Sequence, residues 1–174
     1  MTGVQTCALP IYTAAVHLPR ILLIGDSIVA GHRQALAERL KGRATVAAFS
    51  TSKIVGDPAL PRELALALAD APIDLIVFNN GLHGLDCDDA FYREGLRGFV
   101  DLLRQSTRAR LVWRNSTPIT VQGAPADLDA RDAIAVRRNA IAADIMAQAG
   151  IPAVDLYAAM LGHPEFSAGD GFHY

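Results

Sequence analysis

The chain has 174 residues, of which 51% are hydrophobic and 20% are charged, a composition typical of one globular domain and not of a disordered chain. The net charge is −2 and no run of basic residues stands out, so nucleic acid and anionic membrane surfaces are not favoured as partners. No apolar run approaches the ~20 residues needed to span a bilayer. The two cysteines, Cys7 and Cys87, are far apart and do not indicate a disulfide framework.

The first residues differ in character from the rest of the chain. Residues 1–11 resemble the translation of a DNA-sequencing adapter, and we predict that residues 1–19 are an artefact or a disordered leader. This segment has neither the charged start nor the apolar centre of a signal peptide. The sequence favours the cytoplasm without establishing a compartment, and we place a single folded domain at residues 20–174.

Strands and helices alternate along this domain. Residues 20–25 are a short apolar run that ends in glycine, which predicts a buried parallel strand. Residues 28–40 carry apolar side chains at helical spacing and are followed by Gly42, a pattern typical of an amphipathic helix and its end. A strand over residues 44–49 and a helix over residues 60–68 come next.

The second half of the domain continues the alternation. Residues 73–79 are the clearest strand in the chain, and residues 89–105 form a helix with one apolar face. A fourth strand over residues 109–114 is followed by a loop rich in proline and glycine over residues 117–127. The remaining predicted elements are a long helix over residues 130–149, a fifth strand over residues 151–154, and a short helix or turn over residues 156–161.

Five strands that alternate with helices predict an α/β fold, with a parallel sheet between two layers of helices. In such sheets, ligands bind beyond the carboxyl ends of the strands. Polar residues gather at these ends in this sequence, at residues 25–27, 50–57, 79–84 and 115–117. Their coincidence predicts a functional site at this edge of the sheet.

Ser27 is the candidate nucleophile at that edge. It lies where the first strand turns into the first helix, so its backbone N–H belongs to a helix N-terminus, where partial positive charge gathers. A serine hydroxyl becomes nucleophilic when a base takes its proton; His173 is the candidate base, and Asp170 can orient its ring. Alternatively, Ser27 is a plain helix cap and Asp170 and His173 belong to a solvated tail. The joint occurrence of both features on this framework favours catalysis.

These residues resemble the sequence blocks of the SGNH, or GDSL-type, hydrolases. Residues 24–28, Ile-Gly-Asp-Ser-Ile, are similar to the first block of that family, and residues 170–173, Asp-Gly-Phe-His, match the fifth. Gly56 is similar to the glycine of the second block, and residues 80–84, Asn-Gly-Leu-His-Gly, fall at the third. The resemblance spans residues 20–174, and the first and fifth blocks together are its specific part.

The resemblance implies a flavodoxin-like α/β/α fold and a serine esterase with a triad of Ser27, His173 and Asp170. It implies hydrolysis of small carboxylic esters through an acyl-enzyme, with acylated carbohydrate among the expected substrates. The oxyanion would be bound by the N–H groups of Ser27 and Gly56 and by a side chain of the third block. No metal or organic cofactor is implied, and the oligomeric state is not predicted.

The third block departs from the family pattern, which is Gly-x-Asn-Asp. When the block is aligned on Gly81, His83 stands where asparagine is expected and Gly84 replaces the aspartate. A neutral His83 could donate an N–H to the oxyanion, as imidazole can. Asn79 and Asn80, at the end of the third strand, are the alternative donors. The register favours His83 first and Asn80 next.

The end of the chain is a second departure. Hydrolases of this family usually continue past the histidine into a helix that packs on the sheet, whereas this sequence ends at Tyr174. We therefore expect a domain that is truncated at its C-terminus and less stable than an intact relative. The altered third block and this ending leave a second hypothesis, a non-catalytic ligand- or carbohydrate-binding domain that retains the fold.

Motifs of other α/β enzymes are absent from the sequence. Ser27 is not part of a Gly-x-Ser-x-Gly elbow, which argues against an α/β-hydrolase. The first strand is not followed by a Gly-x-Gly-x-x-Gly motif or by a Gly-Lys-Ser/Thr phosphate loop. Dinucleotide and nucleotide binding are therefore disfavoured.

Overall fold

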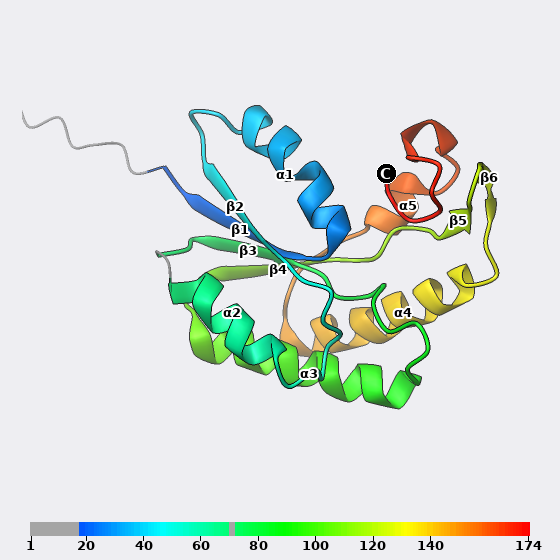
Figure 1. Ribbon diagram of the computed structural model, residues 1–174. Coiled ribbons are helices and arrows are strands. Elements are labelled where there is room, and N and C mark those ends of the chain that lie inside the picture. The colour runs from blue at the N-terminus through cyan, green and yellow to red at the C-terminus, as the bar shows by residue number, and fades with distance from the viewer. Residues whose placement is uncertain (1–17, 70–71) are drawn as a thin grey trace, which may run out of the picture.

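Short apolar runs form the strands of a central parallel sheet, as the computed structural model in Figure 1 shows. The structure describes residues 18–69 and 72–174, so most of the predicted leader lies outside the described residues. All neighbouring strands of the sheet are parallel, and their order is β2-β1-β3-β4-β7. The strands are β1 (Arg20–Gly25), β2 (Thr45–Ser50), β3 (Leu75–Phe78), β4 (Arg110–Arg114) and β7 (Ala153–Val154). The predicted five-stranded parallel sheet is confirmed, in the strand order typical of flavodoxin-like folds.

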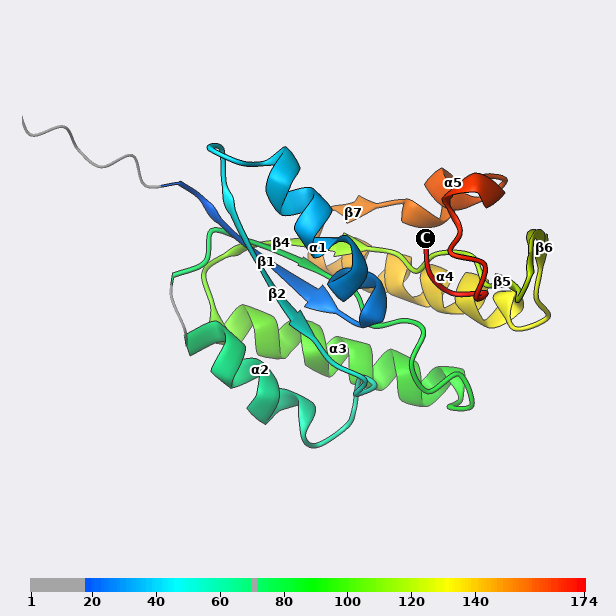
Figure 2. The same cartoon turned by 45° about the horizontal axis from the view of Figure 1, so that its top comes forward.

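Helices cover both faces of the sheet, which gives the three predicted layers (Figures 1 and 2). One face carries α2 (Leu60–Ala69), α3 (Asp89–Ser106) and α4 (Asp132–Ala149). The other face carries α1 (Ser27–Arg39) and the short α5 (Leu156–Met160). No helix of the described ranges is both long and apolar enough to cross a membrane.

The main core lies between the sheet and the layer of three helices. Phe78, in the middle of the sheet, is fully buried. Its ring makes edge-to-face contacts with Phe99 of α3 and Trp113 of β4, with centroid separations of 6.0 and 5.2 Å. This is a favoured geometry for aromatic pairs. The packing gives the carboxyl edge of the sheet, where the polar loops lie, a rigid support.

The face under α1 is less completely covered. Leu23 of β1 is buried there with Ile28 and Val29 of α1, whereas Val77 and Val112 in the neighbouring strands are half-buried. An apolar groove of about 460 Å³ is lined by residues of both α1 and α5.

The prediction of a proline- and glycine-rich loop over residues 117–127, without a strand, is wrong in part. The segment contains an antiparallel hairpin of β5 (Thr120–Val121) and β6 (Ala124–Leu128). Gly123 at its turn has φ of +78°, a conformation that glycine adopts at little cost. The first strand has two residues and the second contains Pro125, so no alternating pattern marks either strand.

Candidate active site

The turn between β1 and α1 presents Ser27 at the carboxyl edge of the sheet. Gly25 allows this tight connection, because a Cβ there would lie 2.5 Å from Cγ2 of Val29. Asp26 caps the helix, and its carboxylate accepts a hydrogen bond from the Ile28 N–H at 3.0 Å. Ser27 is then the first residue of α1, in the turn whose N–H groups have no partner within the helix. Its N–H is therefore available to a ligand with partial negative charge.

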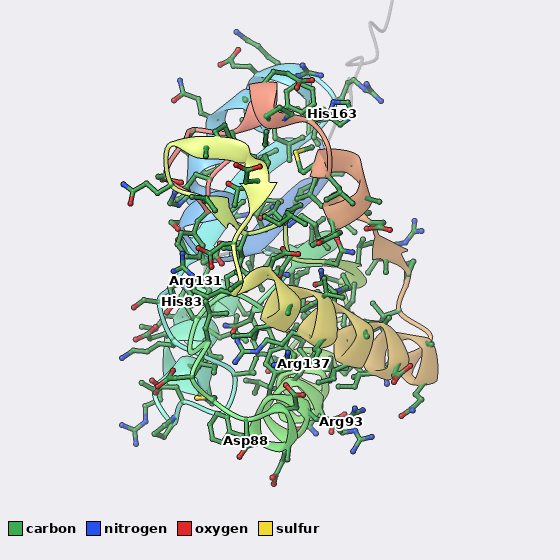
Figure 3. The ribbon with its side chains drawn as sticks, turned by 90° about the vertical axis from the view of Figure 1, so that its right-hand side faces the viewer. His83, Asp88, Arg93, Arg131, Arg137 and His163 are labelled. Carbon is green, nitrogen blue, oxygen red and sulfur yellow. The ribbon has the colours of Figure 1, made fainter. Side chains whose placement is uncertain are left out.

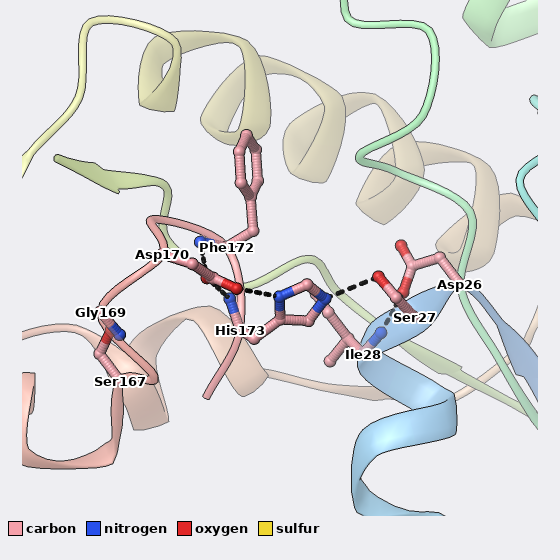
Figure 4. A network of polar contacts seen from close by, with 8 residues as sticks. All are labelled: Asp26, Ser27, Ile28, Ser167, Gly169, Asp170, Phe172 and His173. Atoms are coloured by element: carbon pink, nitrogen blue, oxygen red, sulfur yellow. Dashed lines mark hydrogen bonds and ion pairs between the residues drawn. The ribbon is translucent and has the colours of Figure 1, made fainter. Parts of the chain in front are cut away.

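The Asp170 carboxylate organises the loop at the other end of the chain. One oxygen accepts hydrogen bonds from the N–H groups of His173 and Phe172, at 2.9 and 3.0 Å. The other oxygen lies 2.5 Å from Nδ1 of His173 (Figure 4). The backbone N–H groups foremost, and then the imidazole, hold the pKa of Asp170 well below its ordinary value. Asp170 is thus an anion at neutral pH that fixes the orientation of the His173 ring.

The β5–β6 hairpin anchors this loop. The N–H of Thr120 donates to the Gly171 carbonyl and the N–H of Gly123 donates to the Gly169 carbonyl, both at 2.9 Å. Gly171 has φ of +93°, and a Cβ on it would lie 2.7 Å from the Thr120 carbonyl oxygen. The backbone of the loop and that of the hairpin are therefore in close contact, and this contact fixes the position of His173 relative to the sheet.

His173 and Ser27, 146 positions apart in the sequence, meet at the carboxyl edge of the sheet (Figure 4). Nε2 of His173 lies 2.7 Å from Oγ of Ser27. Nδ1 faces a carboxylate, which can only accept, so Nδ1 carries the proton and Nε2 accepts from the serine hydroxyl. The side chains of His173 and Asp170 are 39% and 45% exposed, so the hydrogen-bonded chain is open to solvent.

A cavity of about 250 Å³ opens beside Ser27 and His173. Its volume is below the ~300–1,000 Å³ usual for small-molecule pockets, which favours a small chemical group as its occupant. The cavity is lined by polar residues of the β1–α1 turn and by apolar side chains from three segments; the lining residues are Asp26, Ser27, Ile28, Leu82, His83, Leu85, Phe172 and His173.

Of the three candidates for the third oxyanion donor, His83 alone lines this cavity. It lies on the loop between β3 and α3 (Figure 3). Both N–H groups of the Asn79 amide are engaged, by the Arg114 carbonyl at 2.7 Å and by Oγ of Ser116 at 3.3 Å. The arrangement leaves Asn79 no N–H for an oxyanion.

Asn80 binds the loop that follows β2. Its amide donates to the Lys53 carbonyl at 2.8 Å and accepts from the Val55 N–H at 3.2 Å. The side chain is buried, and these two bonds tie the β2–α2 loop to the end of β3. Asn80 thus shapes the surroundings of the site by holding a neighbouring loop.

Gly56 lies outside the lining of the Ser27 cavity. It has φ of +91°, and a Cβ there would lie 2.8 Å from Cζ of Phe91 in α3. It lines a separate hollow of about 420 Å³ between α2 and α3. The structure therefore brings together Ser27, His83, Asp170 and His173, whereas the Gly56 N–H as an oxyanion donor stays a prediction.

Two features were not predicted from the sequence: the apolar lining of the Ser27 cavity and the buried charge of Arg138. Ile28, Leu82 and Phe172 lie within the sequence blocks and Leu85 follows the third block, and their position there is the only sequence feature that indicates a place in the cavity. Arg138 of α4 is completely buried, and its signal was a charged residue on the apolar stripe of a helix. Within residues 18–69 and 72–174, no three His, Cys, Asp or Glu side chains are placed to hold a metal ion.

Residues 23–174 match the model of the GDSL-like lipase/acylhydrolase family. Among solved structures, a member of the lipolytic G-D-S-L family from Veillonella parvula is 16% identical, with a TM-score of 0.67 over 88% of each chain. An acetyl xylan esterase from Geobacillus stearothermophilus is 14% identical, with a TM-score of 0.66 over 89% of this chain and 86% of that one. The acetyl xylan esterase AlAXEase is 15% identical, with a TM-score of 0.68 over 88% of this chain and 90% of that one.

At these identities the structural likeness establishes the fold. A comparison with curated protein sequences gives no match. The family match covers most of the sequence, including both the Gly25-Asp26-Ser27 turn and the Asp170–His173 loop. The chain therefore belongs to the GDSL-like lipase/acylhydrolase family.

Proposed function

We propose that this protein is a serine esterase that hydrolyses small carboxylic esters through an acyl-enzyme. The observation that carries the proposal is the hydrogen-bonded chain from Ser27 through His173 to Asp170, with distances of 2.7 and 2.5 Å. A nucleophile within reach of a base, which is itself oriented by a third group, is the arrangement that activates a serine hydroxyl.

In the first half-reaction, Oγ of Ser27 attacks the ester carbonyl carbon while Nε2 of His173 takes the hydroxyl proton. The Asp170 carboxylate stabilises the imidazolium that forms. The oxyanion of the tetrahedral intermediate accepts hydrogen bonds from the Ser27 N–H and from His83. The intermediate collapses, the alcohol leaves with the proton from His173, and the acyl group stays on Ser27.

In the second half-reaction, water takes the place of the alcohol. His173 removes a proton from the water as its oxygen attacks the acyl carbonyl carbon, and the same donors hold the second oxyanion. Collapse of this intermediate releases the acid and returns the proton to Ser27. No step of the cycle needs a metal or an organic cofactor.

The size of the cavity favours a small acyl group, and the exposure of the triad favours an open site for the alcohol. Its volume of about 250 Å³ and the apolar side chains of Leu82, Leu85 and Phe172 suit an acetyl group or a slightly larger one. The side chains of His173 and Asp170 are partly exposed to solvent, which leaves room for a bulky alcohol such as a sugar. The fold shared with two acetyl xylan esterases agrees with acylated carbohydrate as the substrate class.

Turnover of p-nitrophenyl esters of increasing chain length tests the proposal. We expect hydrolysis of the acetate and a steep decline toward the octanoate, because the cavity is small. Ser27→Ala and His173→Ala should each lower kcat by at least ~10³-fold. If the folded protein hydrolyses none of these esters, but binds acetylated xylo-oligosaccharides, the alternative of a non-catalytic carbohydrate-binding domain is correct.

A further inference from the structure

Arg138 of α4 carries a positive charge in the interior. The residue is 0% exposed, and it lies on the buried side of the helix with Ala135, Ile141 and Ala142. Burial of a guanidinium is costly unless its N–H groups find partners. In this protein Nη1 and Nη2 donate to backbone carbonyl groups and the guanidinium contacts an aromatic ring, whereas the Nε–H has no partner among the described residues.

All of these carbonyl groups belong to one loop, residues 81–87, which connects β3 to α3. Nη1 donates to the carbonyls of Gly81 at 3.0 Å and His83 at 2.8 Å. Nη2 donates to the Gly84 carbonyl and, at 3.4 Å, toward that of Cys87. The planar guanidinium presents its donors in a fixed fork, so it can gather carbonyls that point inward from an irregular loop.

The guanidinium is also fixed from one side. Its central carbon lies 4.7 Å from the centroid of the Tyr92 ring, a cation–π contact between α4 and α3. Tyr92 is itself buried, so the ring and the guanidinium support each other within the core. The position of the fork relative to the sheet is therefore set by packed helices.

The same loop forms one wall of the Ser27 cavity. Leu82, His83 and Leu85 line the cavity. Arg138 binds the carbonyl of His83 itself and those of the adjacent Gly81 and Gly84. Gly81 is packed so closely that a Cβ would lie 1.9 Å from Oγ of Ser116. The loop residues 80–88 have no helix or strand of their own, so the bonds to Arg138 supply hydrogen-bond partners that secondary structure does not.

We infer that Arg138 is a positioning residue of the esterase site. It holds the 81–87 loop so that His83 faces the oxyanion and the side chains of Leu82 and Leu85 close the Ser27 cavity. The kinetic part of this inference rests on the proposed function. The structural part, that Arg138 fixes the loop, does not.

Three variants on α4 test the kinetic part. Arg138→Met should lower kcat by ~10–100-fold with little change in KM, because a displacement of about 1 Å at a catalytic group can cost that much. Arg138→Lys keeps the charge, but its single nitrogen cannot serve carbonyls spread along the loop, so an intermediate loss is expected. Arg137→Met is the matched control, because Arg137 of α4 (Figure 3) is exposed and bonds Asp89 of α3 at 3.4 Å. Its kcat should stay within twofold of the wild type.

A double-mutant cycle separates positioning from general destabilisation. His83→Ala removes the donor and should cost ~10²–10³-fold in kcat. If Arg138 acts through His83, adding Arg138→Met to His83→Ala should lower kcat by at most about threefold more. Equal losses from Arg138→Met in the two backgrounds would overturn the role through His83.

The reactivity of the Cys87 thiol tests the structural part without any ester. A Cys7→Ser background leaves Cys87, which is half-buried, as the single thiol. We expect Arg138→Met to raise the rate of reaction with Ellman's reagent by about tenfold, because the loop then opens more often. Arg137→Met should not change that rate, and an unchanged rate in Arg138→Met would overturn the inference. If Arg138→Met does not fold, Arg138→Lys carries both tests.

These readings also distinguish the two proposals. Absence of turnover in the wild-type protein would contradict the proposed function. The rate at which Cys87 reacts with Ellman's reagent would then decide alone whether Arg138 holds the loop. Normal turnover in a folded Arg138→Met variant would contradict the positioning role of Arg138 and would leave the esterase proposal unaffected.

Discussion

Replacement of Gly171 by alanine is a test of how closely the backbone of the C-terminal loop sets the position of His173. The new Cβ would lie 2.7 Å from the Thr120 carbonyl oxygen, well inside the 3.4 Å at which ordinary contact begins. The loop must therefore move away from the β5–β6 hairpin by several tenths of an ångström. The backbone at φ of +93° adds strain, which costs a non-glycine residue about 1–2 kcal/mol.

The kinetic consequence follows from the neighbouring contact. His173 is two residues from Gly171, and its Nε2 lies 2.7 Å from Oγ of Ser27, so a shift of this size lengthens or breaks that hydrogen bond. A misplacement near 1 Å can cost about 10²-fold, and we expect kcat on p-nitrophenyl acetate to fall by roughly 10–100-fold.

Gly169→Ala is the matched control for this experiment. Gly169 also has a positive φ, of +81°, but a Cβ on it would have no neighbour within 4 Å. It should therefore show the strain without the clash, with a similar loss of thermal stability and less than a fivefold loss of kcat. Equal kcat values in Gly171→Ala and Gly169→Ala, with both proteins folded by circular dichroism, would show that the close contact between Gly171 and Thr120 does not set the position of His173.

Two further predictions concern charge and packing. Because hydrogen bonds lower the folded-state pKa of Asp170 below 3.8, its ionised form stabilises the fold fully above pH 3.8, and this stabilisation is lost only as the pH falls through the lowered value. A carbon-13 NMR titration of Asp170 should show a midpoint below 3.8 that stays low in His173→Ala, which keeps the backbone N–H groups; a midpoint at or above 3.8 in the wild type contradicts this. Phe78→Ala should lower the free energy of unfolding in urea by ~3–5 kcal/mol, because Phe78 fills the centre of the aromatic core. The half-buried Val77 on the opposite face is its control: Val77→Ala should cost about 1 kcal/mol, and equal losses would refute the account of the core.

Most of the fold could be predicted because apolar periodicity has a direct physical cause. Strands buried on both faces must be continuously apolar, which is why residues 20–25 and 73–79 were recognisable. The β5–β6 hairpin could not be predicted, because its strands are short and their partner is the loop at residues 169–171. Strands of this kind are stabilised by contacts with distant residues, which no local pattern records.

The site also has a part that the sequence predicts and a part that it does not. Ser27, Asp170 and His173 could be predicted to meet, because parallel strands bring their carboxyl ends to one edge and each residue lies within a specific motif. The roles of Asn79 and Asn80 could not be separated from that of His83 by sequence. The Asn79 amide donates to the Arg114 carbonyl and the Asn80 amide donates to the Lys53 carbonyl. These partners are distant in the sequence and are brought close only when the chain folds.

We propose that Ser27 is a nucleophile activated by His173. The most direct test of this proposal is intact-mass and peptide-mass spectrometry of the protein after treatment with a fluorophosphonate. We expect one phosphonyl adduct per chain, located on Ser27, and a rate of formation that falls by at least ~10²-fold in His173→Ala. Failure of the folded wild-type protein to form the adduct, or an adduct on another residue, would contradict the proposal.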